Sequence, residues 1–406
     1  MKTLRVLLTG GGTGGHIFPL IAVAEELKTQ SEKSNLKLDI RYFGPLALEY
    51  YQEITNHGIK YNSVISSKLR RYWSFLNLLD GFKFLGSLFQ VLWKIYWFMP
   101  EVIFSKGGPG SLAVVLAGKF YFIPVVIHES DSIPGLTSRL SSFFAKKIFL
   151  GFEGASQYFS AGGGFPPPPG YGRAGSSGGK SRIEVVGNPI RYSFSEQIEA
   201  VRAAGVKGQI ECKKSFSFNA QEPVVLFIGG SQGAERINNF VLENLIDLIK
   251  NFQVLHQVGS NNYDNYKKEY EFASKGWNNL MKSRYKFAGF LSSEQMVVAL
   301  TAADIIVSRS GAGAIFEMAA FGKPAVLVPL LESANGHQQQ NAVLYENAGA
   351  AVVVEQQNFF GSLVIKELRD LLLDKQRLQK MSLAASNFYK PKAAATIAQY
   401  LLNLKS

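Results

Sequence analysis

Residues 308–317, Ser-Arg-Ser-Gly-Ala-Gly-Ala-Ile-Phe-Glu, combine a turn of small residues with one acidic side chain. The apolar run 305–307 predicts a buried strand before the turn, 312–320 a helix after it, and 325–328 a second strand. The free N–H groups and the positive dipole end of a helix N-terminus suit a phosphate. Glu317 follows close enough to accept hydrogen bonds from neighbouring hydroxyls. These features predict a nucleotide pocket, and an ordinary strand–turn–helix unit with a surface glutamate is the open alternative.

A second turn, residues 10–16, has the sequence Gly-Gly-Gly-Thr-Gly-Gly-His and follows a strand expected at 4–9. A helix is expected from near Phe18, with Pro19 in its first turn. The glycines let the backbone approach a phosphate closely. Their spacing also fits a dinucleotide fingerprint, but the acidic residue usual after the second strand is missing. His16 closes the turn, and on sequence it is either a catalytic base or a structural group.

Three further polar segments follow predicted strands, where open α/β sheets place their ligands. They are the glycine turn 106–111, in which Lys106 is positioned to neutralise an anion, the segment His128-Glu129-Ser130-Asp131, and the glycine turn 229–234. A cluster of amides at 335–342 suits a ligand rich in hydroxyls. Together the turns indicate a ligand with several phosphate-like groups. There is no Walker lysine motif, and no metal-binding spacing stands out, so we expect no metal and no cofactor.

The two halves of the chain repeat one order, a strand, a glycine-rich turn and a helix, with further alternating strands and helices. This order predicts an α/β protein with two doubly wound Rossmann-like domains facing across a cleft. The expected domains are 1–186 and 187–390, and 391–406 is expected to be a helix that packs back on the first domain. Residues 160–181 are rich in glycine, serine and proline, which predicts an insertion in a surface loop.

The chain has 406 residues, a net charge of +12 and one cysteine, Cys212. The positive charge favours anionic partners, but no long basic run is present, so we expect no nucleic acid. The start of the chain does not resemble a signal peptide and is expected to be cytoplasmic. Three of the four tryptophans fall within residues 68–99, where Asp80, Lys83 and Lys94 interrupt the apolar sequence. This stretch is either a buried helix pair or, as we favour, an amphipathic surface for an anionic membrane.

The order of these motifs resembles that of the MurG family, the bacterial peptidoglycan N-acetylglucosaminyltransferases. The segments that carry the resemblance are 11–16, 128–129, 187–191, 229–234, 308–312 with Glu317, and 337–342. The resemblance implies a GT-B fold and an inverting, metal-independent transfer of N-acetylglucosamine from UDP-GlcNAc. The implied acceptor is the C4 hydroxyl of the muramoyl sugar in lipid I, undecaprenyl-diphospho-N-acetylmuramoyl peptide, and the implied product is lipid II.

The same resemblance assigns roles to residues in both halves. For the donor, Glu317 would bind the ribose hydroxyls, the main chain at Leu291 would read uracil, and His337 and Gln338 would contact the sugar. The donor diphosphate would be held by Arg191, Ser231 and the turn of Ala312, Gly313, Ala314 and Ile315, and Gln232 and Arg309 would also bind substrate. The acceptor diphosphate would face the loops 106–111 and 11–15, the latter with Thr13, Gly14 and Gly15. Asp131 would also bind substrate, His16 would be the general base, and Glu129 would be a second catalytic residue.

The implied partners are UDP-GlcNAc, lipid I, anionic inner-membrane lipids bound through residues 68–99, and other cell-wall synthesis proteins. The implied location is peripheral, on the cytoplasmic face of the bacterial inner membrane. The chain departs from the family pattern at Ser130-Asp131, where Gln-Asn is usual, at Ala314, where threonine is common, and in the insertion 160–181. The open alternatives are another GT-B glycosyltransferase for glycolipids or natural products, a UDP-GlcNAc 2-epimerase, a membrane-bound nucleotide-sugar-binding subunit, and a dehydrogenase.

Overall fold

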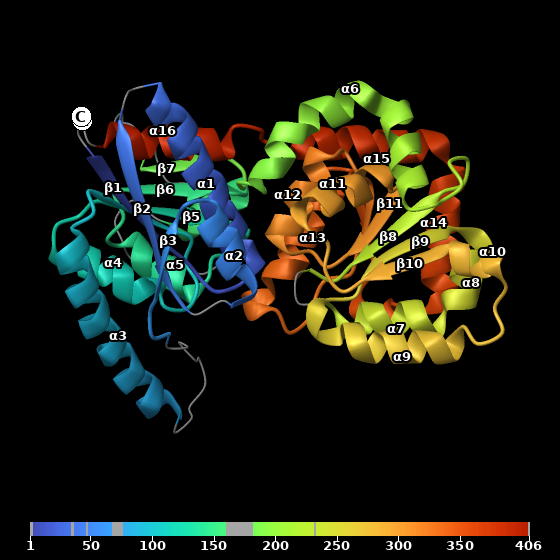
Figure 1. Cartoon of the computed structure of the whole chain (residues 1–406), viewed down its shortest axis with the longest axis horizontal. Coiled ribbons are helices and arrows are strands. Elements are labelled where there is room, and N and C mark those ends of the chain that lie inside the picture. The colour runs from blue at the N-terminus through green and yellow to red at the C-terminus, as the bar shows by residue number, and fades with distance from the viewer. Residues whose placement is uncertain are drawn as a thin grey trace. The chain divides into compact units, whose positions relative to one another are not determined.

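A computed structural model describes residues 3–33, 36–45, 48–66, 76–159, 182–230 and 233–404, with the backbone alone at 48–49, 76–79 and 334. The chain divides into two compact units (Figure 1). The first unit comprises Met1–Tyr192 and Lys392–Ser406, and the second comprises Ser193–Pro391. The first unit therefore runs to Tyr192, beyond the boundary expected at 186. The predicted insertion at 160–181 lies outside the described residues.

Strands and helices alternate along the first unit. Its strands are β1 Thr3–Thr9, β2 Lys37–Gly44, β3 Lys60–Ser63, β4 Val102–Ser105, β5 Val125–Glu129, β6 Lys147–Leu150 and β7 Ile183–Val185. Its helices are α1 Gly14–Glu32, α2 Leu48–Asn56, α3 Leu76–Phe98, α4 Ser111–Phe120, α5 Leu136–Ser142 and α16 Ala393–Asn403, with a 3-10 turn η1 at Glu153–Tyr158.

The strands of the first unit form, within the described residues, a seven-stranded sheet in the order β3-β2-β1-β4-β5-β6-β7. Each pairing is parallel, and Thr9 at the end of β1 lies opposite Ser105 at the end of β4. The chain runs outward from β1 to β3 and then returns to β4 beside β1. The strand order reverses between β1 and β4, which is the position where open parallel sheets bind ligands.

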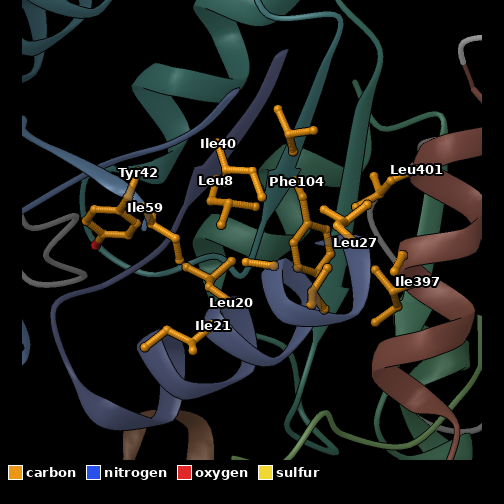
Figure 2. Packing of buried hydrophobic residues seen from close by; sticks show 14 of the residues in the cluster. Leu8, Leu20, Ile21, Leu27, Ile40, Tyr42, Ile59, Phe104, Ile397 and Leu401 are labelled. Atoms are coloured by element: carbon orange, nitrogen blue, oxygen red, sulfur yellow. The ribbon is translucent and has the colours of Figure 1, made fainter. Parts of the chain in front are cut away.

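Alternate residues of β1 face the two sides of this sheet. Leu4, Val6 and Leu8 lie in the core under α1 and α16, and Leu7 lies in the core under α3 and α4. Figure 2 shows Ile397 and Leu401 of α16 beside Leu27 of α1 and Phe104 of β4. The last helix of the chain thus completes the core of the first unit.

The second unit repeats this plan. Its strands are β8 Val224–Ile228, β9 Gln253–Gln257, β10 Tyr285–Ala288, β11 Ile305–Ser308, β12 Ala325–Leu327 and β13 Ala351–Val353. Its helices are α6 Tyr192–Ser215, α7 Glu235–Glu243, α8 Leu245–Asn251, α9 Tyr263–Ala273, α10 Asn279–Ser283, α11 Ser293–Ala302, α12 Ala312–Ala320, α13 His337–Asn347, α14 Gly361–Leu373 and α15 Lys375–Phe388. Short 3-10 turns are η2 Ser260–Asn262, η3 Ala334–Gly336 and η4 Gln356–Asn358.

The described strands of the second unit form a parallel sheet in the order β10-β9-β8-β11-β12-β13. The strand order reverses between β8 and β11, where Ile228 lies opposite Ser308. Helices cover both faces of the sheet (Figure 1). The two Rossmann-like folds expected from the sequence are therefore confirmed, and each has a reversal point beside glycine-rich turns.

Two local predictions were wrong. Helix α1 begins at Gly14, not near Phe18, so Pro19 lies inside the helix. Gly14 is helical and close to Phe18 and to the hydroxyl of Tyr50, so a side chain there would crowd both. His128 and Glu129 belong to strand β5 instead of following it, because the pairing with β6 continues through both residues.

Residues 76–98 form the single helix α3 and not a pair of buried helices. Ser87, Val91, Ile95 and Phe98 face the core. The opposite side is apolar and exposed, and it comprises Phe82, Leu85, Phe89, Trp93, Tyr96 and Trp97. Residues 68–75 of the predicted membrane stretch lie outside the described residues. In the part of the chain that the structure describes, no helix combines the length and apolar character needed to cross a bilayer.

Candidate active site

The reversal point of the first unit brings two glycine turns together. The N–H of Lys106 donates to the carbonyl of Thr9, and the hydroxyl of Tyr42 donates to the carbonyl of Gly10. Gly108 has a φ of 86°, and a Cβ placed on it would lie 2.8 Å from both the Gly11 nitrogen and Nε2 of His16. Only glycine fits at this contact, because the backbone is left-handed and the space is filled.

His16 lies in the first turn of α1, where its ring nitrogen faces a hydroxyl. Its Nδ1 is 2.8 Å from Oγ1 of Thr13, the residue before the helix. Burial and, to a smaller extent, the Lys106 ammonium lower the pKa of His16, the Asp131 carboxylate opposes both, and the net value is about 4. The imidazole is therefore neutral near pH 7. If Nδ1 donates its hydrogen to Thr13, Nε2 has a free lone pair that can accept a proton.

Lys106 is buried beneath the two turns, with 4% of its surface exposed. Its Nζ lies 2.7 Å from Nδ1 of His128 and 3.3 Å from Oδ1 of Asn188, and it also donates to Oγ of Ser130. These three acceptors match the three N–H donors of an ammonium group. The sequence suggested a lysine that faces an anion in the turn, and that prediction was wrong because the side chain points into the protein.

The contacts of Lys106 define the protonation of His128. An ammonium group only donates hydrogen bonds, so Nδ1 of His128 accepts, and Nε2 carries the hydrogen and donates to the carbonyl of Gly187 at 2.8 Å. Burial, reinforced by the charge of Lys106, keeps the pKa of His128 well below its usual value. His128 is therefore a neutral link between β5 and the segment that begins at Gly187.

Two carboxylates complete the site of the first unit. Glu129 is buried at the end of β5, and its Oε1 accepts a hydrogen bond of 3.0 Å from the Asp131 nitrogen. Burial raises the pKa of Glu129, and the nearby Asp131 raises it further. Asp131 is half-buried and acts electrostatically on both His16 and Lys106. The predicted residues Thr13, Gly14, Gly15, His16, Glu129 and Asp131 thus come from the segment after β1 and from the end of β5, and β4 lies between these two strands in the sheet.

Helix α12 begins at the reversal point of the second unit and lacks a side-chain cap at its N-terminus. A Cβ placed on Gly311 or Gly313 would meet no atom within 4 Å, so the space over the helix start is open. Ala312 and Ile315 face the core. Gly313, Ala314 and the half-buried Glu317 lie on one face of the helix, since residues three and four apart are neighbours. The free N–H groups and the Glu317 carboxylate therefore border one space.

Two buried side chains tie α12 to the start of α13. Oγ of Ser310 donates to the Gln338 carbonyl at 2.7 Å, and Nδ2 of Asn341 donates to the Ser310 carbonyl at 3.2 Å. Oε1 of Gln338 accepts a hydrogen bond of 3.1 Å from the Leu330 nitrogen. The sequence did not predict a role for Ser310, although a small hydroxyl residue beside the turn was a usable signal. His337 is the first residue of α13, next to this connection.

The guanidinium of Arg309 makes structural contacts with neighbouring segments of the second unit. Its Nη1 donates to the carbonyls of Val328 and Pro329 at 3.0 and 3.3 Å and to Oε1 of Gln356 at 2.8 Å. Burial lowers its pKa, although the charge of Glu332 works in the opposite direction. Arg309 thus fastens the end of β11 to the ends of its neighbours.

The remaining predicted residues are spread more widely. Leu291 is buried just before α11, whose first turn is closed by a capping box of Ser292 and Gln295. Arg191 belongs to the first unit, with its guanidinium 4.3 Å from the centroid of the Phe18 ring. It is therefore not in the unit that carries the other residues assigned to the donor diphosphate. Ser231 and Gln232 lie outside the described residues.

Gly230 and Gly233 flank these two residues in the sequence. Gly230 and Gly233 have φ values of 81° and 77°, and a Cβ on Gly233 would collide with the Val258 carbonyl. Asn238 of α7 donates to that same carbonyl at 2.9 Å. The β8–α7 turn therefore approaches the end of β9 closely, which requires glycine at 233.

Comparisons with known proteins agree with this architecture. Residues 6–150 match the glycosyltransferase family 28 N-terminal domain, and residues 224–397 match the corresponding C-terminal domain. The crystal structure of Acinetobacter baumannii MurG has a TM-score of 0.66 at 23% identity, covering 98% of this chain and 99% of that one. A UDP-GlcNAc 2-epimerase from Neisseria meningitidis, bound to UDP-GlcNAc, has a TM-score of 0.62 at 17% identity, with 99% of both chains covered. These two likenesses concern the fold.

Two curated relatives carry the name UDP-N-acetylglucosamine–N-acetylmuramyl-(pentapeptide) pyrophosphoryl-undecaprenol N-acetylglucosamine transferase. The protein from Treponema denticola is 32% identical, covering 98% of this chain and 96% of its own. The protein from Clostridium kluyveri is 33% identical, covering 94% and 95%. The two domain matches and the two parallel sheets define a family 28 glycosyltransferase. Within that class, the chain belongs to the family of these N-acetylglucosamine transferases, the MurG family.

Proposed function

We propose that the chain transfers N-acetylglucosamine from UDP-GlcNAc to the C4 hydroxyl of the muramoyl sugar of lipid I, which forms lipid II. The names of the relatives supply the donor and the acceptor. The observation that carries the proposal is the open, uncapped start of α12 with Glu317 on the same helix face. It offers N–H donors for a diphosphate and a carboxylate for ribose hydroxyls, which together fit a nucleoside diphosphate.

The second unit would hold the donor. The N–H groups at the start of α12 would stabilise the negative charge that develops on the departing UDP, without a divalent cation. Ser310 and Asn341 would keep the N-termini of α12 and α13 in register, so that Gln338 and His337 flank the sugar. Ser231 and Gln232 would complete the phosphate turn, and the main chain at Leu291 would read uracil.

The first unit would hold the acceptor at the turns beside His16. Nε2 of His16 would remove the proton of the C4 hydroxyl as that oxygen attacks the anomeric carbon, and the bond to UDP would break with inversion. A base with a pKa near 4 is neutral but weak. An acceptor diphosphate bound beside the turns would raise that pKa, because a nearby anion favours the imidazolium form. Glu129 and Asp131 would orient the sugar hydroxyls.

The exposed face of α3 would rest on the membrane that holds lipid I. Phe89, Trp93 and Trp97 are each at least 66% exposed, and Lys83 lies on the same helix. An exposed apolar surface of this kind marks an interaction site, and aromatic side chains with basic neighbours suit an anionic interface. This surface supports our proposal that the protein is peripheral on the cytoplasmic face of the bacterial inner membrane.

The test is transfer of labelled N-acetylglucosamine from UDP-GlcNAc to a short-chain lipid I analogue, with a metal chelator present. We expect a product whose new glycosidic bond is β, since the donor is an α-linked sugar nucleotide and the reaction inverts. Release of a 2-epimer without acceptor would instead indicate an epimerase. Binding of UDP-GlcNAc without turnover, together with no effect of His16→Ala, would indicate a binding subunit.

A further inference from the structure

The buried ammonium of Lys106 connects three separate parts of the first unit. Its backbone belongs to the turn after β4, and its Nζ contacts His128 of β5, Ser130 beyond β5, and Asn188. Oδ1 of Asn188 also accepts a hydrogen bond of 2.7 Å from Oγ of Ser130. One charged group thus fixes both residues that flank Glu129, together with the segment that leads toward the second unit.

Lys106 is also a direct neighbour of the turn that carries His16. A Cβ placed on Gly10 would lie 3.4 Å from Cβ of Lys106 and 3.5 Å from Cβ of His16, so both side chains begin beside the position that a side chain on Gly10 would occupy. The charged groups that act on His16 come from two different turns. They are Lys106 after β4 and Asp131 after β5, and their effects on the imidazole have opposite signs.

Two carboxylates act electrostatically on the Lys106 ammonium. Glu129 and Asp131 both favour its charged form, whereas burial opposes it and lowers its pKa to about 8. His128 is neutral and contributes only a lone pair. An isolated buried ammonium would be costly, and the two carboxylates with three hydrogen-bond acceptors make this one tolerable. Of the two carboxylates, Asp131 is the half-buried one, and it also acts electrostatically on His16.

We infer that Lys106 is a positioning residue for the proposed transfer. It fixes the segment 128–131 and, together with Asp131, sets the electrostatic environment of His16. The inference rests on the proposed function, because it gives His16 the task of accepting a proton. It also explains how a carboxylate at position 131 is accommodated beside a site for a diphosphate. The positive charge of Lys106 offsets the negative charge of the Asp131 carboxylate.

The inference predicts opposite effects for the two members of the pair. Lys106→Met removes a repelling charge, so His16 should protonate more readily, and its titration midpoint should move up by about one pH unit. Asp131→Asn removes an attracting charge, so the midpoint should move down by a similar amount. The double variant should return close to the wild-type midpoint. General damage to the fold would not produce shifts of opposite sign that cancel.

Lys323 of the second unit offers a matched control. It is half-buried, its Nζ donates to the carbonyls of Thr301 and Ala303 at 3.0 and 2.8 Å, and desolvation lowers its pKa to about 8. Lys323→Met removes an equivalent ammonium outside the proposed site. It should leave the titration of His16 unchanged.

The experiment is an NMR titration of full-length protein labelled at the histidine ring carbons, which is practicable because the chain has only five histidines. His16→Gln assigns the signal, and thermal unfolding checks each variant. The kcat/KM–pH profile for the lipid I analogue should shift with the NMR midpoint. The inference would be overturned if the two single variants shifted the His16 midpoint in the same direction, or if Asp131→Asn did not shift it. If Lys106→Met does not fold, the result for Asp131→Asn alone decides. Failure of wild-type transfer would count against the proposed function instead, since the titration needs no turnover.

Discussion

Oγ of Ser310 donates a hydrogen bond of 2.7 Å to the main-chain carbonyl of Gln338, although the two residues belong to different strand–helix connections. Ser310 is fully buried, and its own carbonyl accepts from Asn341. The bond therefore holds the first turn of α13 against the turn that precedes α12. Because both turns border the space proposed for the donor, this bond connects the packing of the second unit with its chemistry.

Ser310→Ala should weaken UDP-GlcNAc binding about five- to thirtyfold, because the loss of a buried hydrogen bond costs about 1–2 kcal/mol and frees the start of α13. Isothermal titration calorimetry would measure the dissociation constant. Ser215→Ala is the matched control, since the exposed Ser215 donates only to the Cys212 carbonyl one turn back. Equal affinity in both variants would show that the Ser310 bond does not position the donor site.

Glu317→Gln should raise the dissociation constant of UDP about tenfold, because a charged acceptor on ribose hydroxyls is replaced by a neutral amide. The sharper comparison uses 2′-deoxy-UDP. Wild-type protein should bind it more weakly than UDP, whereas the variant should distinguish the two ligands much less. Glu211→Gln, at an exposed position of α6, is the control. If the variant keeps the full preference for UDP, Glu317 does not contact the 2′-hydroxyl.

The main helices and strands of the second unit were predictable because clear sequence signals mark where they begin and end. Helix α12 has the predicted limits, 312–320, since the apolar run ends at small and charged residues there. The start of α1 was not predictable, because Gly14 and Gly15 are weak helix formers and their helical conformation depends on neighbours such as Tyr50. Tertiary packing overrode the local preference at that point.

The contacts of Lys106 could not be predicted for a different reason. The sequence places a lysine in a glycine turn, where it would be expected to face solvent or a ligand. Its partners His128 and Asn188 lie 22 and 82 positions further along the chain. Only the order of β1, β4 and β5 in the sheet brings them under the same turn. Sequence reasoning could therefore group the residues of one motif, but it could not predict the contacts between motifs.

Acid should destabilise the second unit through His256. The imidazole is fully buried, with Nδ1 3.0 Å from the Tyr285 hydroxyl and Nε2 3.1 Å from Oδ1 of Asn238, and burial lowers its pKa to about 3. Between that value and the ordinary pKa of about 6.5, the unfolded chain binds a proton that the folded chain does not. The free energy of unfolding should therefore fall as pH drops below about 6.5, by about 3 kcal/mol from this residue by pH 4.

Urea denaturation at several pH values would measure this effect. In His256→Gln, the unfolding free energy should depend less steeply on pH between about pH 6 and 4. The difference in bound protons between the unfolded and folded chain should be smaller by up to one. The variant will be less stable at neutral pH because the hydrogen bonds change, so the slope and not the absolute stability is the readout. His57→Gln is the control, since His57 lies in the first unit and is only partly buried. An unchanged slope in His256→Gln would refute the prediction.

Trp93 and Trp97 should anchor α3 on membranes. Their rings form an edge-to-face pair with centroids 5.8 Å apart, on the exposed side of the helix. Burial of a large apolar side chain contributes about 2 kcal/mol, so Trp93→Ser with Trp97→Ser should lower partitioning onto vesicles of anionic phospholipid more than tenfold. Sedimentation with sucrose-loaded vesicles would measure the partition coefficient.

Phe272→Ser provides the matched control for this surface, because Phe272 is 82% exposed but lies on α9 of the second unit. It should leave vesicle binding unchanged. Transfer to a water-soluble, short-chain acceptor should be unaffected in the tryptophan variant, whereas transfer to lipid I in vesicles should fall in proportion to binding, since only the second reaction requires docking on the bilayer. Equal losses with both acceptors would mean that the two tryptophans support the fold of the first unit and not its attachment to the membrane.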